Sequence, residues 1–204
     1  MRTPSETLRD RWLETLLPMV ETRGWSEEAA RIAAQEAGLD EGEQALAAPL
    51  GLNDLIDHFF EQAAEAMLAD LATQDLDALR VHEKVAAGIK AWLAALEPNK
   101  PAVSKAAARG MMPWGAGAAA NRIWKVADLI WEAAGDTATD YNRQTKRALL
   151  SAVLPSIVLR WLVTDDEAHM DELIMRRLKQ AMKLGQTGSK LIGPVLDALD
   201  KRRS

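Results

Sequence analysis

Apolar residues recur along the chain at the three- and four-residue spacing of an amphipathic helix. Leu8, Trp12, Leu16 and Val20 form the first such stripe, and comparable stripes occur almost to the C-terminus. This spacing places side chains on one face of an α-helix, whereas a strand requires alternation. The pattern predicts an all-α fold of about nine to ten helices.

Caps, glycines and prolines divide these stripes into separate helices. Thr3, Pro4 and Glu6 predict a capping box with proline at the first helical position, and Gly24 ends that helix. Ser26 caps the second helix. Further helices are expected over 40–48, from Asn53, over 74–96, up to Met112, up to Gly135, over 139–163, up to Gly185 and over 188–200.

Composition supports this fold class and excludes several kinds of site. The 36 Ala and 27 Leu outnumber the 17 Val and Ile, which favours helices over strands. The absence of cysteine excludes disulfides, zinc–thiolate sites and catalytic thiols. No charge-free apolar stretch reaches the ~18 residues of a membrane span. The early charges Arg2, Glu6 and Arg9 argue against a secretory signal.

The first three expected helices are joined by glycine-containing turns. Gly24-Trp25 precedes the second helix, and Gly38-Leu39 opens the turn into the third. This arrangement resembles the helix-turn-helix start of the TetR regulators. The charges argue against DNA, because a recognition helix must offer Lys or Arg to phosphates. Residues 32–79 contain no Lys or Arg but 11 carboxylates, three of them in 40–48.

Residues 123–163 contain a distinctive pattern of polar and aromatic residues. It combines Asp128, Trp131, Ala134-Gly135-Asp136, Thr139-Asp140, Tyr141, Asn142, Thr145 and Lys146-Arg147, then an apolar helix ending at Asp165-Asp166. This pattern resembles the accessory-protein family numbered nine in the Coq series of ubiquinone biosynthesis. The resemblance extends over residues 8–185. Arg143 and Gln144 depart from it, because the family often has aromatic residues there.

The resemblance implies a fold and a function. Members of this family have a TetR-like fold, form homodimers, bind isoprenoid lipids and quinone intermediates, and present substrate to the di-iron hydroxylase of ubiquinone synthesis. It implies a helix-turn-helix-like region (1–52), a ligand-binding and dimerisation domain (53–187) and an amphipathic C-terminal helix (188–204). The expected location is cytoplasmic, peripheral on the inner face of the bacterial inner membrane.

The family pattern also suggests a partner-binding patch. Taken singly, its residues are better explained as helix caps and a solvated turn. Their combination favours a surface for the partner enzyme, formed by Asp136, Asp140, Tyr141, Asn142, Lys146 and Arg147.

Seven of the ten aromatic residues are tryptophan, and five of those lie between residues 92 and 161. Trp and Met provide large, adaptable walls for an apolar cavity, although a filled core explains them as well. The resemblance favours a pocket for an isoprenoid or acyl chain. Its expected lining is Ile89, Trp92, Met111, Met112, Trp114, Ile123, Trp124, Ala127, Ile130, Trp131, Leu149, Val153 and Ile157.

The last expected helix is apolar on one side and basic at its ends. Such a helix can lie on an anionic membrane or pack against a neighbouring helix. The family uses its C-terminal helix on the membrane, so we expect contacts from Lys190, Leu191, Ile192, Val195, Leu196 and Leu199.

No catalytic constellation stands out. Asp166 and His169 have the spacing used in di-iron bundles, but those bundles need a second copy of that motif and two more carboxylates. There is no nucleophile elbow, P-loop or dinucleotide turn. We therefore expect no catalytic residue, metal or cofactor. The alternative functions are a ligand-responsive TetR-type regulator and a helical scaffold without a ligand.

Overall fold

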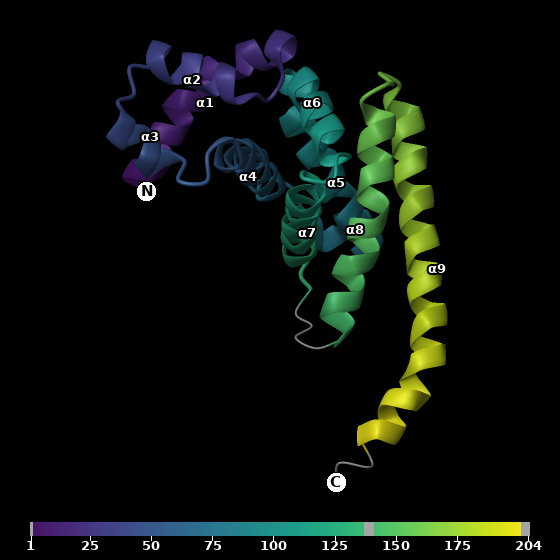
Figure 1. Cartoon of the computed structure of the whole chain (residues 1–204). Coiled ribbons are helices and arrows are strands. Elements are labelled where there is room, and N and C mark those ends of the chain that lie inside the picture. Colours follow the sequence, from purple (N-terminus) through teal and green to yellow (C-terminus); the bar gives the residue numbers. More distant parts are fainter. Residues whose placement is uncertain (1, 137–140, 201–204) are drawn as a thin grey trace. The chain divides into compact units, whose positions relative to one another are not determined.

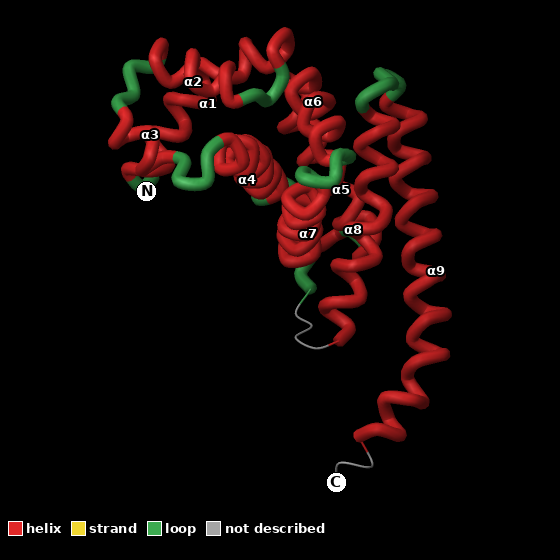
Figure 2. The backbone as a smooth tube through the Cα atoms, viewed as in Figure 1, coloured by secondary structure: helices red, strands yellow, loops and turns green. Residues whose placement is uncertain are grey.

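The computed structural model describes residues 2–136 and 141–200, without the side chains of residues 141–142 and 184–200. Over these residues it contains helices and loops and no strand (Figure 2), so the predicted all-α class is confirmed. The α-helices are α1 (Pro4–Arg23), α2 (Glu27–Glu36), α3 (Glu41–Ala47), α4 (Leu52–Leu71), α5 (Val81–Leu96), α6 (Lys100–Gly110), α7 (Ala116–Ala133), α8 (Tyr141–Trp161) and α9 (Glu167–Asp200).

The helices belong to two compact units. The first contains the residues up to Gln74 together with Lys90–Arg122, and the second contains Asp75–Ile89 and the residues from Ile123 onward. Helices α5 and α7 contribute to both units.

Two tryptophans hold the first unit together by packing and by hydrogen bonds. Trp12 on α1 donates from Nε1 to the carbonyl of Ala30 on α2 at 2.8 Å. Trp25 donates to the carbonyl of Ala102 on α6 at 2.9 Å and packs on Phe59 of α4, with ring centroids 5.7 Å apart. A buried indole ring contributes a large apolar area to the core, while its N–H remains hydrogen-bonded to an acceptor. These side chains therefore join helices that are distant in sequence.

The second unit is dominated by α8 and α9, which lie side by side and antiparallel (Figure 1). Leu150, Leu154 and Ile157 are buried on α8, and Ile174 and Leu178 are buried on α9. These positions repeat at helical spacing, so each helix presents one apolar stripe to the core. Leu159 and Val163 lie outside this stripe and are exposed. The apolar helix expected ahead of Asp165-Asp166 therefore has one buried face and a partly exposed remainder.

Local capping signals located some helix ends and missed others. The capping boxes of α1 and α3 and the Ser26 cap of α2 are present. Helix α4 begins at Leu52, one residue before the predicted start at Asn53. Gly51 occupies the N-cap position with a φ of +69°. The expected helix over 74–96 is also wrong at its start. Leu76–Ala78 form a separate 3-10 turn there, and the N–H of Arg80 bonds to the Glu83 carboxylate ahead of α5.

The expected break between residues 185 and 188 is absent, and α9 continues through both glycines to Asp200. A glycine costs a helix only about 1 kcal/mol relative to Ala, so a long helix can contain one. The C-terminal amphipathic segment is consequently a continuation of α9.

Candidate functional site

The segment with the family pattern joins α7 to α8. Gly135 ends α7 with a φ of +82°, a conformation that favours glycine, and places Asp136 directly after the helix. Residues 137–140 lie outside the described residues. Asp128 and Trp131 project from α7, while Lys146 and Arg147 project from α8. This arrangement brings opposite charges from the two helices into contact.

Arg147 is the centre of an ion-pair network. Its side chain is 2% exposed, and its Nη1 donates to Asp136 Oδ2 at 2.9 Å. Its Nε donates to Asp128, which also accepts from Arg143 Nη2 at 3.1 Å. Buried guanidinium groups are tolerated where several carboxylate oxygens accept their N–H groups. The network therefore fixes α8 against the end of α7.

Lys146 occupies the edge of the same network. Its Nζ lies 2.6 Å from Asp136 Oδ1 and 5.4 Å from the centre of the Trp131 ring. The Trp131 Nε1 donates to the carbonyl of Lys146 at 3.1 Å. Trp131 thus contacts both the backbone and the charge of one residue. Since the Lys146 side chain remains 32% exposed, it can also meet a partner.

The electrostatics of the network follow from these contacts. Burial raises the pKa of Asp128, but hydrogen bonds from Arg147 and Arg143 outweigh it and lower the pKa overall. Burial lowers the pKa of Arg147, while the hydrogen bonds to Asp128 and Asp136 raise it overall. Both groups are therefore held in their charged forms.

The predicted partner-binding residues occupy different environments. Asp136 and Arg147 lie inside the network, with exposed side-chain fractions of 6% and 2%. Lys146 is partly exposed. Asp140 lies outside the described residues, and the side chains of Tyr141 and Asn142 are not described. Arg143 also belongs to the network, although it was not among the predicted partner-binding residues. Its four-residue spacing from Arg147 was the available signal.

The predicted lipid-lining residues also separate into groups. Fully or almost fully buried positions are Ile89, Trp92, Ala127, Ile130 and Ile157. A second group is partly exposed: Ile123, Trp124, Trp131, Leu149 and Val153. A third group, formed by Met111, Met112 and Trp114, is exposed in the turn between α6 and α7.

Two buried donors of the first unit have no hydrogen-bond partner among the described residues. They are Trp92 Nε1 and Arg122 Nη2. Trp92 packs against Phe60 of α4 with ring centroids 6.4 Å apart, and Arg122 pairs with Asp57 of α4. An unpaired buried donor costs free energy, so each such group needs an explanation. A polar atom of a bound ligand, accepting a hydrogen bond from the donor, is one such explanation.

The predicted membrane residues Lys190, Leu191, Ile192, Val195, Leu196 and Leu199 lie on α9, and their side chains are outside the described set. Within the described part of the chain, no helix is long and apolar enough to cross a membrane. The described side chains also contain no group of three or more His, Cys, Asp or Glu arranged to hold a metal ion.

Comparison with known proteins identifies both the fold and the family pattern. A TetR transcriptional regulator from Nitrosomonas europaea superposes with a TM-score of 0.65 at 18% identity, covering 86% of this chain and 98% of the regulator. That likeness confirms the predicted TetR-like fold.

The sequence relatives are mitochondrial proteins. The chain is 27% identical over 195 residues to the ubiquinone biosynthesis protein COQ9 of Bos taurus and to that of Homo sapiens. The match covers 91% of this chain and 61% of each relative, so the chain spans less than two thirds of their length.

The sequence model of the COQ9 family matches residues 116–185, which contain α7, α8 and the first part of α9. This range includes the whole ion-pair network from Asp128 to Arg147. The chain therefore carries the COQ9 family's sequence pattern over residues 116–185 on a TetR-like fold, and its predicted resemblance to that family is confirmed.

Proposed function

We propose that the chain is a lipid-binding accessory protein of ubiquinone biosynthesis, which binds an isoprenoid quinone intermediate and presents it to a partner hydroxylase. The observation that carries this proposal is the coincidence of the COQ9 pattern with the α7–α8 junction. A partner enzyme would meet the exposed edge of the network around Lys146. The chain would contribute binding and orientation, and the partner would contribute the chemistry.

The unpaired donors in the first unit support a ligand with both apolar and polar parts. Trp92 offers an apolar ring face beside Phe60 and an indole N–H without an acceptor. Quinones and phenols carry ring oxygens that can accept such a hydrogen bond, while their isoprenoid tails need apolar surface. Arg122 Nη2 is a second donor for an oxygen atom.

Dimerisation is part of the proposal. Leu159 on α8, Val163 just after that helix and Met182 on α9 are 47%, 73% and 45% exposed. Exposed apolar side chains on two adjacent helices fit the pairing of two copies into a four-helix bundle. The protein would act at the inner face of the bacterial inner membrane, where isoprenoid quinones dissolve. The C-terminal part of α9 would contact that membrane.

A TetR-type regulator is the competing function, because the fold is shared. The acidic residues around α3 argue against it. Asp40 and Glu43 form its capping box, and Glu43 also pairs with Arg11 of α1 at 3.3 Å. Glu41 is exposed. Helix α3 therefore presents carboxylates where phosphate contacts require cations.

Lipid extraction tests the proposal directly. We expect mass spectrometry of lipids extracted from the purified full chain to identify an isoprenoid quinone or its precursor. Trp92→Phe should retain apolar lipids but lose preference for those with a ring oxygen. Trp25→Phe is the matched control, because its indole N–H already bonds to Ala102. Protein without lipid, combined with a shift of its own upstream DNA at physiological salt, would favour the regulator instead.

A further inference from the structure

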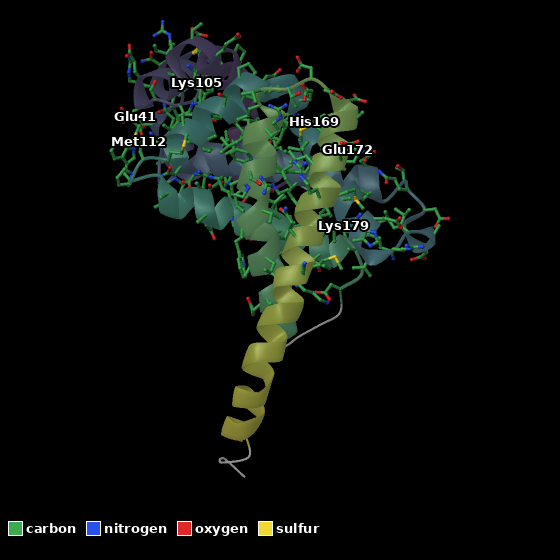
Figure 3. All side chains as sticks on the ribbon, turned by 90° about the vertical axis from the view of Figure 1, so that its right-hand side faces the viewer. Glu41, Lys105, Met112, His169, Glu172 and Lys179 are labelled. Atoms are coloured by element: carbon green, nitrogen blue, oxygen red, sulfur yellow. The ribbon has the colours of Figure 1, made fainter. Side chains whose placement is uncertain are left out.

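The turn between α6 and α7 exposes three large apolar side chains. Met111, Met112 and Trp114 are 71%, 46% and 72% exposed, and Pro113 lies among them. Met112 lies at the outer edge of the view in Figure 3. Monomeric proteins rarely expose several large apolar side chains in succession without a use for them. We call residues 111–114 the apolar turn.

The backbone of the apolar turn is ordered by its own hydrogen bonds. Met112 N donates to Arg109 O at 3.1 Å, and Gly115 N donates to Met112 O at 2.9 Å. Met111 N donates to Ala107 O at 3.1 Å. Unpaired peptide groups oppose entry into an apolar phase, and these three N–H groups are already paired. The turn can therefore enter such a phase at a lower cost than an open loop.

The charges that flank the apolar turn in the sequence are of one sign. Between Glu97 and Asp128 the sequence contains Lys and Arg at five positions and no Asp or Glu. Lys105 is exposed on α6, and Arg109 stands in the last turn of that helix. Figure 3 labels Lys105 and Met112. Cations beside exposed Trp and Met match the anionic headgroups and the interfacial zone of a bilayer.

We propose that the apolar turn inserts into the headgroup region of an anionic lipid bilayer, with Trp114 and Met112 as the inserted side chains and Lys105 and Arg109 as headgroup contacts. A protein partner fits less well. A stable protein interface buries roughly 1,000 Å² or more, and a four-residue turn offers much less. A bilayer needs only a few inserted side chains assisted by nearby cations. This contact belongs to the first unit and is separate from the C-terminal part of α9.

Vesicle flotation of the full chain tests this contact. We expect Trp114→Ser combined with Met112→Ser to weaken binding to equimolar phosphatidylcholine–phosphatidylglycerol vesicles about tenfold. Leu50→Ser is the matched control, because Leu50 is 78% exposed in the same unit but comes after an acidic segment. Lys105→Gln with Arg109→Gln should reduce the preference for anionic over pure phosphatidylcholine vesicles, whereas Arg31→Gln should not. Circular dichroism would verify that each variant folds.

A spectroscopic measurement locates the inserted residue. Brominated phosphatidylcholine, mixed into the anionic vesicles, quenches tryptophans that enter the bilayer. We expect Trp114→Phe to remove most of this quenching, while Trp124→Phe leaves it largely intact. Unchanged flotation of the double serine variant, or unchanged quenching in Trp114→Phe, would overturn the proposal. So would a change of oligomeric state without a change in vesicle binding, since the turn would then contact a second copy. The inference does not depend on the proposed function. A protein that carries an isoprenoid quinone but does not bind vesicles would contradict the membrane contact and leave the proposed function standing.

Discussion

Arg147 on α8 and Asp136 at the end of α7 form an ion pair at 2.9 Å with both side chains almost fully buried. Asp128 binds the same guanidinium from α7. Two carboxylates therefore surround one buried cation. Removal of Arg147 takes away the cation that both carboxylates share, and the loss of one partner is the costly case for an ion pair inside a protein.

Arg147→Ala should lower the free energy of unfolding by up to about 3–5 kcal/mol, because it removes the buried cation that Asp128 and Asp136 share and leaves Asp136 to the partly exposed Lys146. Arg147→Lys should recover only part of this loss, since an ammonium cannot bond to both carboxylates in the geometry of a guanidinium. Urea denaturation would measure both. Arg160→Ala, at an exposed position in the last turn of α8, is the control and should change little. Equal effects at 147 and 160 would contradict a stabilising network.

The lowered pKa of Asp128 predicts how stability changes in acid. The pKa of an Asp in an unfolded chain is about 3.9, and the pKa of Asp128 in the folded protein lies lower. The stabilisation from this group is therefore complete above the unfolded pKa and is lost as pH falls through the folded pKa. Asp128→Asn should make the urea midpoint less dependent on pH between about 5 and 3. Glu132→Gln, an exposed site on α7, should leave that dependence unchanged.

Gly115→Ala should destabilise the turn between α6 and α7. A Cβ at this position would overlap the carbonyl oxygen of Arg109, which is backbone and cannot rotate away. Gly117→Ala is the matched control, because its Cβ would meet nothing within 4 Å. Since Ala favours a helix over Gly by about 1 kcal/mol, the control should be neutral or slightly stabilising. Thermal unfolding followed by circular dichroism would compare the two, and equal melting temperatures would refute this close approach.

Asp10→Ala should destabilise the first unit by about 1–3 kcal/mol, since it leaves buried hydrogen-bonding groups unpaired. Asp10 Oδ1 lies 2.6 Å from Nε2 of buried His58 and accepts from Gln62 Nε2 at 2.7 Å. Urea denaturation at neutral pH would measure the loss. Glu14→Ala, at an exposed site on the same helix, provides the comparison. A loss no larger than that of Glu14→Ala would show that the Asp10 contacts contribute nothing.

Local signals predicted much of the fold because they act over only a few residues. The caps at Thr3, Ser26 and Asp40 need only their own first turn, and all three are present. The predicted start of α4 and the predicted helix break at the glycines within α9 were wrong, because competing local signals had similar strength. Glycine can end a helix or be tolerated inside one, and the choice depends on the neighbouring residues.

The candidate site could be predicted only in part. The residue pattern between Asp128 and Arg147 was sufficient to predict the resemblance to the COQ9 family, but it did not separate buried from exposed side chains. Arg147 was expected on a partner-facing surface and is 2% exposed, while Arg143 was missed. Met111, Met112 and Trp114 were expected in a pocket and stand exposed in a turn.

The sequence by itself determined the helical class, most helix boundaries, the family pattern and the acidic character of residues 32–79, because periodicity, caps and charge are local properties. Only the tertiary structure decided which polar groups are buried and which apolar groups are exposed. Burial depends on helices that are distant in sequence, as when Asp128 and Asp136 enclose Arg147. A hydropathy pattern records the face of a helix but not the elements that cover that face.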